Sequence, residues 1–115
     1  MPIRQNCWLL ALALAGCAGS PESDVELGEV LSADDVAIHY DVRGTGAPTL
    51  VLVHGWMNTR EIWGEHPETL SRSHRVVTLD LAGHGESGND RIYWTMGSFG
   101  DDVAAVVREL ALDDV

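Results

Sequence analysis

The sequence has no lysine, and positive charge of any kind is scarce. Its seven basic residues, all arginine, are outnumbered by 18 aspartate and glutamate residues, so the formal net charge is −11 over 115 residues. A surface this negative repels phosphates and anionic lipid headgroups, which excludes electrostatic binding of nucleic acid. Apolar residues still make up 45% of the chain and charged residues 22%, the balance of a folded protein rather than a disordered acidic tail. The length allows one domain at most.

Long hydrophobic runs are also missing. The apolar stretch Trp8–Ala15 is too short to span a bilayer, which takes about 20 residues, but it fits the apolar part of a secretory signal peptide. The segment that follows, Leu14-Ala15-Gly16-Cys17, resembles the lipobox of bacterial lipoproteins, which implies cleavage before Cys17 and acylation of that cysteine. We therefore expect residues 1–16 to be a lipoprotein signal peptide. An ordinary signal peptide, or a core helix with an incidental cysteine, is the alternative.

Cysteine occurs only at Cys7 and Cys17. Removal of the signal peptide would take Cys7 away and leave no partner for an internal disulfide, which agrees with export to an oxidising compartment. Residues 17–24 are mostly small, polar and turn-forming, as in a flexible tether between a lipid anchor and a domain. These features predict an exported, membrane-anchored lipoprotein of a bacterial cell envelope, with residues 25–115 as its folded part.

Residues 25–115 show strand and helix patterns in the alternating order of an α/β sheet. Residues 36–43 alternate apolar and polar side chains, which predicts a strand with one buried and one wet face, in a hairpin with residues 25–31. Leu50–Val53 is apolar throughout and predicts a central strand covered on both faces. The other expected elements are an irregular helix within 59–72, broken or started near Pro67, a strand over 75–80, a loop over 81–89 and a helix after Thr95.

The last helix has the clearest pattern, with apolar residues three or four positions apart on one face: Phe99, Val103, Val106, Val107 and Leu110. The sequence offers two candidate N-cap residues, so it does not decide where this helix begins. Ser98 with Asp101 matches a capping box, whereas Thr95 would cap one turn earlier and place Gly97 and Gly100 inside the helix, at some cost in helix propensity.

Polar motifs follow the two apolar strands at their carboxyl ends, where ligands bind in open α/β sheets. The first is His54-Gly55-Trp56, and the second runs from Asp80 to Ser87. A single histidine in such a turn more commonly bonds nearby backbone. A metal site from His54, Asp80 and His84 has little support, because their spacing matches no close ligand motif such as His-x-x-x-His. We expect neither a metal nor a cofactor.

In order and spacing, these motifs resemble the α/β-hydrolase superfamily, in the branch with a His-Gly-x turn after the third strand and a Gly-His-Gly-x-Ser loop after the fourth. The resemblance implies an antiparallel hairpin followed by parallel strands with crossover helices. It also implies that the Trp56 backbone N–H contributes to an oxyanion hole, and that His54, Gly55, Trp56 and Met57 line a pocket for a small-molecule substrate. Residues 80–87 would form a structural loop, so His84 is not expected to be the catalytic base.

Such a hydrolase needs a nucleophile in a Gly-x-Ser-x-Gly elbow, and the sequence has none. The nearest match, residues 85–89, lacks the second glycine and follows the wrong strand. We therefore expect residues 25–115 to be the amino-terminal part of a serine-type α/β hydrolase for an ester, lactone or similar bond. As given, it would be inactive and would leave Leu50–Val53 as an open, association-prone edge.

Three other functions stand beside this one. Epoxide hydrolases and haloalkane dehalogenases share the turn but commonly have proline where this chain has Met57, which disfavours both activities. The alternative from a different class is a non-catalytic envelope lipoprotein that uses part of the fold as a binding or assembly module.

Overall fold

The computed structural model describes residues 24–115, so the expected signal peptide, Cys17 and nearly all of the expected tether lie outside the described residues. Along the chain the elements are β1 (Glu26–Leu31), β2 (Ala37–Arg43), β3 (Leu50–Val53), the short 3₁₀ helix η1 (Arg60–Trp63), α1 (His66–Leu70), β4 (Val76–Leu79) and α2 (Met96–Glu109). Within residues 24–115, no helix has the length and apolar character needed to cross a bilayer.

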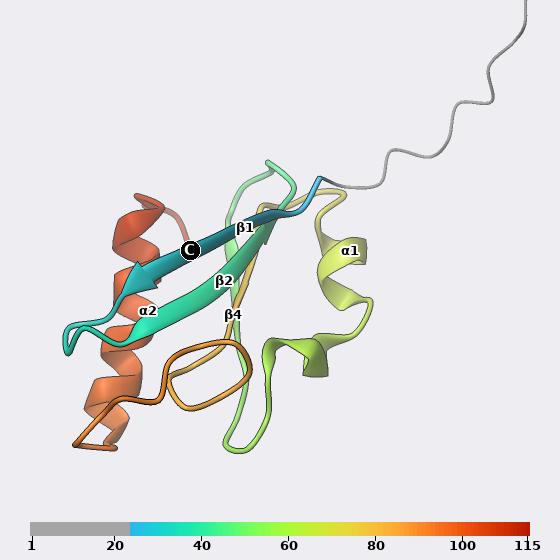
Figure 1. Cartoon of the computed structure of the whole chain (residues 1–115). Helices are drawn as coiled ribbons and strands as arrows, with labels where there is room; N and C mark the ends of the chain where they lie inside the picture. The colour runs from blue at the N-terminus through green and yellow to red at the C-terminus, as the bar shows by residue number, and fades with distance from the viewer. Residues whose placement is uncertain (1–23) are drawn as a thin grey trace, which may run out of the picture.

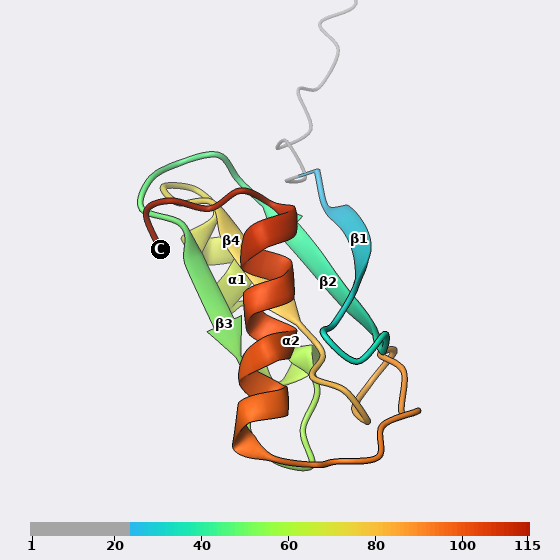
Figure 2. The same ribbon diagram turned by 90° about the vertical axis from the view of Figure 1, so that its left-hand side faces the viewer.

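The strands form one mixed sheet in the order β1-β2-β4-β3. β1 and β2 make the predicted antiparallel hairpin, β2 pairs antiparallel with β4, and β3 pairs parallel with β4. Helix α2 covers one face of the sheet, and η1 and α1 lie on the other (Figures 1 and 2). This arrangement confirms the predicted hairpin followed by parallel strands with crossover helices.

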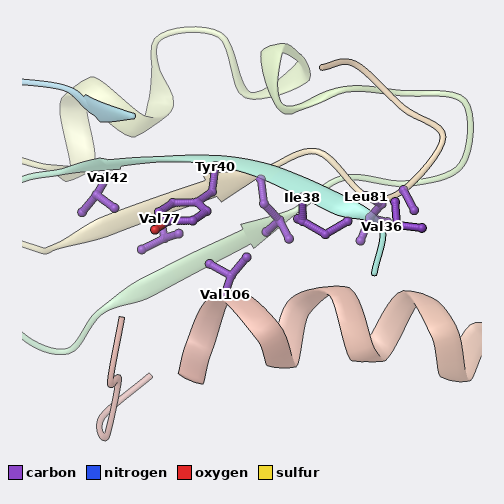
Figure 3. Packing of buried hydrophobic residues seen from close by; sticks show 9 residues of the cluster. Val36, Ile38, Tyr40, Val42, Val77, Leu81 and Val106 are labelled. Carbon is purple, nitrogen blue, oxygen red and sulfur yellow. The ribbon is translucent and has the colours of Figure 1, made fainter. Parts of the chain in front are cut away.

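The hydrophobic core lies between the sheet and α2. Alternate side chains of β2 and of the residue before it point toward the helix and pack with Val106 (Figure 3): Val36, Ile38, Tyr40 and Val42. The predicted burial of this face is therefore confirmed. Because burial disfavours its charged form, the pKa of the Tyr40 hydroxyl is raised.

The opposite face of β2 is less exposed to solvent than predicted, because Asp41 is only 5% exposed. Its carboxylate accepts hydrogen bonds from Thr78 Oγ1 at 2.8 Å and from Arg43 Nη1 at 2.5 Å. The Nε of Arg60 in η1 lies 3.4 Å from the other carboxylate oxygen. Alternation in the sequence shows that the two faces differ, but not that arginines cover the polar one.

Strand β3 is an edge strand within residues 24–115, so the expected covering of both its faces is not met by this part of the fold. Its side chains are half-buried, and Val53 is 40% exposed. Across the free edge, the Thr49 N–H donates to the Asp114 carbonyl at 2.9 Å, and Figure 2 shows the carboxyl terminus beside the start of β3. The open β3 edge that was expected for this part of the fold taken alone is present in the described residues.

Thr95 is the N-cap of α2, which settles the two alternatives. The Ser98 N–H donates to Thr95 Oγ1 at 3.1 Å, and the Thr95 N–H donates to Ser98 Oγ at 2.9 Å. Ser98 is therefore the reciprocal partner of the cap and not the cap itself. The helix accommodates Gly97 and Gly100 in its first turns. The irregular helix expected within 59–72 is two short pieces, η1 and α1, with Pro67 near the start of the second.

Candidate active site

The carboxyl ends of β3 and β4 bring the two histidine motifs together. His54 follows β3, His84 lies in the loop after β4, and their ring centroids are 5.1 Å apart. His54 is 4% exposed. The Leu81 N–H donates to its Nε2 at 3.1 Å, so the ring proton is on Nδ1, which donates to the Gly55 carbonyl at 2.8 Å. His54 is therefore a neutral residue that ties the end of β3 to the end of β4.

His84 has the same tautomer. The Met57 N–H donates to His84 Nε2 at 3.2 Å, and His84 Nδ1–H donates to the Ala82 carbonyl at 2.9 Å. Both ring nitrogens are therefore occupied by backbone groups. His84 thus joins the turn after β3 to the loop after β4 through two backbone groups.

The turn after β3 presents backbone donors that have no partner within residues 24–115, among them the Trp56 N–H. Among the described residues, no hydrogen bond uses the Trp56 N–H, whereas the next amide is bound to His84 and the Asn58 N–H donates to the Gly55 carbonyl at 3.2 Å. A Cβ added to Gly55 would meet nothing within 4 Å, so contacts in residues 24–115 do not require glycine there. The backbone at Gly55 and Trp56 is open to an approaching molecule.

Two cavities meet at this turn. The larger, of about 680 Å³, is an open hollow lined by Trp56, Met57, Asn58, Thr59, Gly83, His84, Gly85, Asn89 and Trp94. The smaller, of about 320 Å³, is almost wholly apolar and lies between the end of β3 and α2, where it is lined by Val53, His54, Gly55, Trp56, Leu81, His84, Met96, Phe99, Gly100 and Val103. Trp56 and His84 belong to both linings. The structure thus gathers the predicted pocket residues 54–57 around the two cavities.

The loop after β4 is held by Asp80, which is 2% exposed. Its carboxylate accepts from the Arg60 N–H and Arg60 Nη1, each at 2.7 Å, and from the Glu86 N–H at 3.1 Å. Gly85 has a φ of +51°, and a Cβ there would lie 2.3 Å from Asp80 Oδ2. Burial alone would lower the pKa of Arg60, but its bond to Glu86 and the charges of Asp80, Glu86 and Asp41 outweigh this and raise the pKa. The loop is therefore pre-ordered around a buried ion pair.

A second buried ion pair, around Arg91, was missed by the sequence analysis. The Arg91 side chain is fully buried and bonds Asp34 in the hairpin turn at 2.6 Å and Asp102 in α2 at 2.5 Å. Asp102 also accepts from Ser32 Oγ at 2.6 Å and from the Ala82 N–H at 3.1 Å. One signal was available in the sequence, because Asp102 interrupts the apolar face of the last helix. The bond to Arg91 lowers the pKa of Asp34, and the bond to Asp34 helps to raise that of Arg91.

Metal ligands are not gathered anywhere in residues 24–115, where no group of three or more His, Cys, Asp or Glu side chains is arranged to hold an ion. His54 and His84 are near one another, but each uses both ring nitrogens for backbone hydrogen bonds. The chemistry this site offers is therefore hydrogen bonding by the exposed Trp56 amide beside an apolar cavity.

Comparison with known proteins identifies the family. The protein-family model described as the alpha/beta hydrolase fold matches residues 48–115. The chain is 36% identical over 76 residues to a pimeloyl-[acyl-carrier protein] methyl ester esterase of Edwardsiella ictaluri, covering 66% of this chain and 29% of that protein. It is 34% identical over 87 residues to a non-heme haloperoxidase of Rhodococcus erythropolis, covering 75% of this chain and 31% of that protein.

A solved structure shows the same likeness. A thermophilic esterase from Thermogutta terrifontis superposes with a TM-score of 0.66 at 30% identity, over 76% of this chain and 33% of the esterase. The chain thus spans about a third of the length of each of these relatives. It belongs to the α/β-hydrolase family and covers an amino-terminal part of that fold.

Proposed function

We propose that this chain is the oxyanion-binding part of a serine-type hydrolase that cleaves an ester, lactone or similar bond. The observation that carries the proposal is the unpaired Trp56 N–H at the end of β3, at the junction of the two cavities. An amide in that position can donate to the oxygen that becomes negative when a nucleophile attacks an ester carbonyl. One such donor contributes about 3 kcal/mol to catalysis.

The composition of the smaller cavity supports an uncharged substrate group. Its lining includes Val53, Leu81, Met96, Phe99 and Val103, and no carboxylate or guanidinium faces it among the described residues. The net charge of −11 disfavours anionic substrates as well. The names of two relatives, a methyl ester esterase and a thermophilic esterase, point to ester hydrolysis in proteins that share this part of the fold. The nucleophile, the acid and the catalytic histidine of such a hydrolase would lie in sequence beyond residue 115.

The test begins with the coding sequence after codon 115. A Gly-x-Ser-x-Gly within the next dozen or so codons, as the family's nucleophile elbow requires, together with hydrolysis of p-nitrophenyl esters by the expressed product, is the expected result. A stop codon directly after Val115 would contradict the proposal and favour the non-catalytic binding or assembly module.

Two substitutions at one position separate the amide from the side chain. Trp56→Ala keeps the N–H and should change the preference among acyl chain lengths. Trp56→Pro removes the N–H and should lower kcat by about 10²- to 10³-fold, the usual loss for one oxyanion donor. Circular dichroism confirms that both variants fold. Loss of all turnover in folded Trp56→Ala would contradict the role of the amide.

We also propose that the protein is exported and anchored to the bacterial envelope through an acylated Cys17. Support comes from the Leu14-Ala15-Gly16-Cys17 segment alone. Metabolic labelling with a palmitate analogue should tag the wild type and Cys7→Ala but not Cys17→Ala. Equal labelling of the two variants would refute the anchor.

A further inference from the structure

We propose that His84 is a positioning residue of the oxyanion turn, which holds the Met57 amide so that the Trp56 amide remains the free donor. This inference rests on the proposed function, because it concerns the same turn. His84 itself touches no reacting atom in this arrangement. Its role is exerted through the backbone of residues 56 and 57.

The turn needs an external anchor. Met57 has a φ of 60°, in the left-handed region that side-chain-bearing residues seldom occupy. Two contacts lie inside the turn, at 3.2 Å from the Asn58 N–H to the Gly55 carbonyl and 3.5 Å from Asn58 Nδ2 to the Trp56 carbonyl, and neither involves the Met57 N–H. The bond from the Met57 N–H to His84 Nε2 is therefore the contact that fixes the strained residue to the rest of the protein.

His84 is in turn fixed from the opposite side. Its Nδ1–H donates to the Ala82 carbonyl at 2.9 Å, which leaves Nε2 as an acceptor. The Ala82 N–H donates to Asp102 of α2 at 3.1 Å. The His84 ring also packs edge-on against Trp56, with centroids 5.4 Å apart, and against Phe99 at 6.2 Å. A continuous set of contacts thus links α2 to the oxyanion turn.

This geometry decides which of two adjacent amides faces a substrate. The Met57 N–H is engaged by His84 and cannot donate to a ligand, whereas the Trp56 N–H is available. Without an acceptor at His84 Nε2, Met57 can leave its left-handed conformation, and the peptide groups on either side of it rotate. The Trp56 donor would then lose its fixed direction, which oxyanion stabilisation requires.

Two amide substitutions separate the two bonds of His84. In His84→Gln, the side-chain oxygen can reach the position of Nε2 and accept from the Met57 N–H. In His84→Asn, the shorter side chain can reach only the Ala82 carbonyl, so the Met57 bond is lost while the loop contact is kept. The Gln variant also lacks the ring, and is therefore the matched control for any general effect of replacing it.

The experiment uses the product of the complete reading frame, labelled with ¹⁵N-methionine and ¹⁵N-histidine. With three methionines in this chain, the Met57 amide signal can be assigned by substitution. Hydrogen exchange of that amide should be about tenfold faster in His84→Asn than in the wild type and near the wild-type rate in His84→Gln. The kcat for p-nitrophenyl esters should fall in the Asn variant with KM nearly unchanged, and recover in the Gln variant.

The outcomes distinguish the two proposals. Equal exchange rates and equal kcat in the two variants would overturn the role of His84. If the wild type hydrolyses no ester, the proposed function fails, and the Met57 exchange rate still tests the contact. If the Asn variant does not fold, the wild-type ¹⁵N spectrum of His84 decides. A proton on Nδ1 with a bare Nε2 supports the inference, and a proton on Nε2 overturns it.

Discussion

At the scale of single residues, arginine carries out the long-range polar organisation of this lysine-free chain. Arg60 joins η1 to the loop after β4 through Asp80, and Arg91 joins the hairpin turn to α2 through Asp34 and Asp102. The planar guanidinium suits both positions, because its fixed fork of donors can bond two carboxylates at once. Neither arginine lies on an element with a regular hydrophobic period, so the sequence pattern does not identify either as a member of an ion pair.

The buried pair of Arg91 and Asp102 should dominate the stability of this region. Asp102→Asn keeps an acceptor for the Ala82 N–H but removes the charge opposite Arg91, and breaking such a pair costs about 3–5 kcal/mol. Urea denaturation should show that loss in the free energy of unfolding. Asp101→Asn, at the exposed neighbouring position, should stay within about 0.5 kcal/mol of the wild type. Similar losses in the two variants would contradict the assignment.

Asp34 should make stability depend on pH in the acid range. Its folded-state pKa lies below the ordinary value of 3.8 because of the bond from Arg91. Its contribution is therefore complete above about pH 4 and is lost as the pH falls through the lowered folded pKa. The free-energy difference between wild type and Asp34→Asn should be constant from about pH 5 to pH 7 and shrink below about pH 4. A difference that persists unchanged in strong acid would argue against the ion pair.

At the scale of elements, the sequence patterns predicted the secondary structure correctly for those elements that pack against one another within residues 24–115. The β2 alternation, the loop over 81–89 and the apolar face of α2 all agree with the sequence patterns. The first residue of α2 was not decided, because Thr95 and Ser98 both match cap motifs and only the reciprocal bonds distinguish them. The covering of β3 is incomplete within residues 24–115, since an apolar run shows that a strand is suited to burial but not that a neighbour is present.

The candidate site was predictable in part, and the division has a physical reason. The placement of His54 and His84 at adjacent strand ends follows from parallel topology, which the apolar runs indicated. Hydrogen bonds between segments about 27 residues apart determine the rest of the site. They fix the tautomers of both rings, the left-handed conformation of Met57 and the free Trp56 amide. No local pattern encodes such contacts.

Gly100 should be replaceable by alanine with a gain in stability. A Cβ at this position in α2 would meet nothing within 4 Å, and glycine inside a helix costs about 0.5–1 kcal/mol relative to alanine. Thermal unfolding of Gly100→Ala should therefore occur at higher temperature. Gly28→Ala is the contrasting case, because its Cβ would lie 2.3 Å from Cζ of the Tyr40 ring, and it should destabilise the hairpin. A lower unfolding temperature for Gly100→Ala would contradict the conclusion that a Cβ fits there without a clash.

At the scale of the whole molecule, the two edges of the sheet differ in their protection. The β1 edge carries Glu26, Glu29 and Gly28, whereas β3 consists of four apolar residues. Charged residues on an edge strand oppose pairing with another chain, and an apolar edge invites it. The described part of the chain therefore has one edge suited to association.

We expect the polypeptide of residues 24–115 to self-associate through β3. Sedimentation velocity should show a mass that rises with protein concentration, and Val53→Lys should reduce this rise by charging the edge. Leu27→Lys, at an exposed position on β1, is the control and should leave association unchanged. A concentration-independent monomer with a cooperative unfolding transition would refute the expectation.

The Arg91 network also bears on how the protein opens locally. Arg91 lies 57 residues from Asp34 and 11 residues from Asp102, so one buried cation spans segments from both ends of the described chain. The loop before α2 and the first turns of α2 cannot separate without leaving Arg91 or Asp102 unpaired in the interior, and release of the hairpin turn breaks the bonds from Arg91 to Asp34 and from Ser32 to Asp102. The hairpin turn, the loop before α2 and the first turns of α2 should therefore exchange their amides as one cooperative unit, with a common opening free energy.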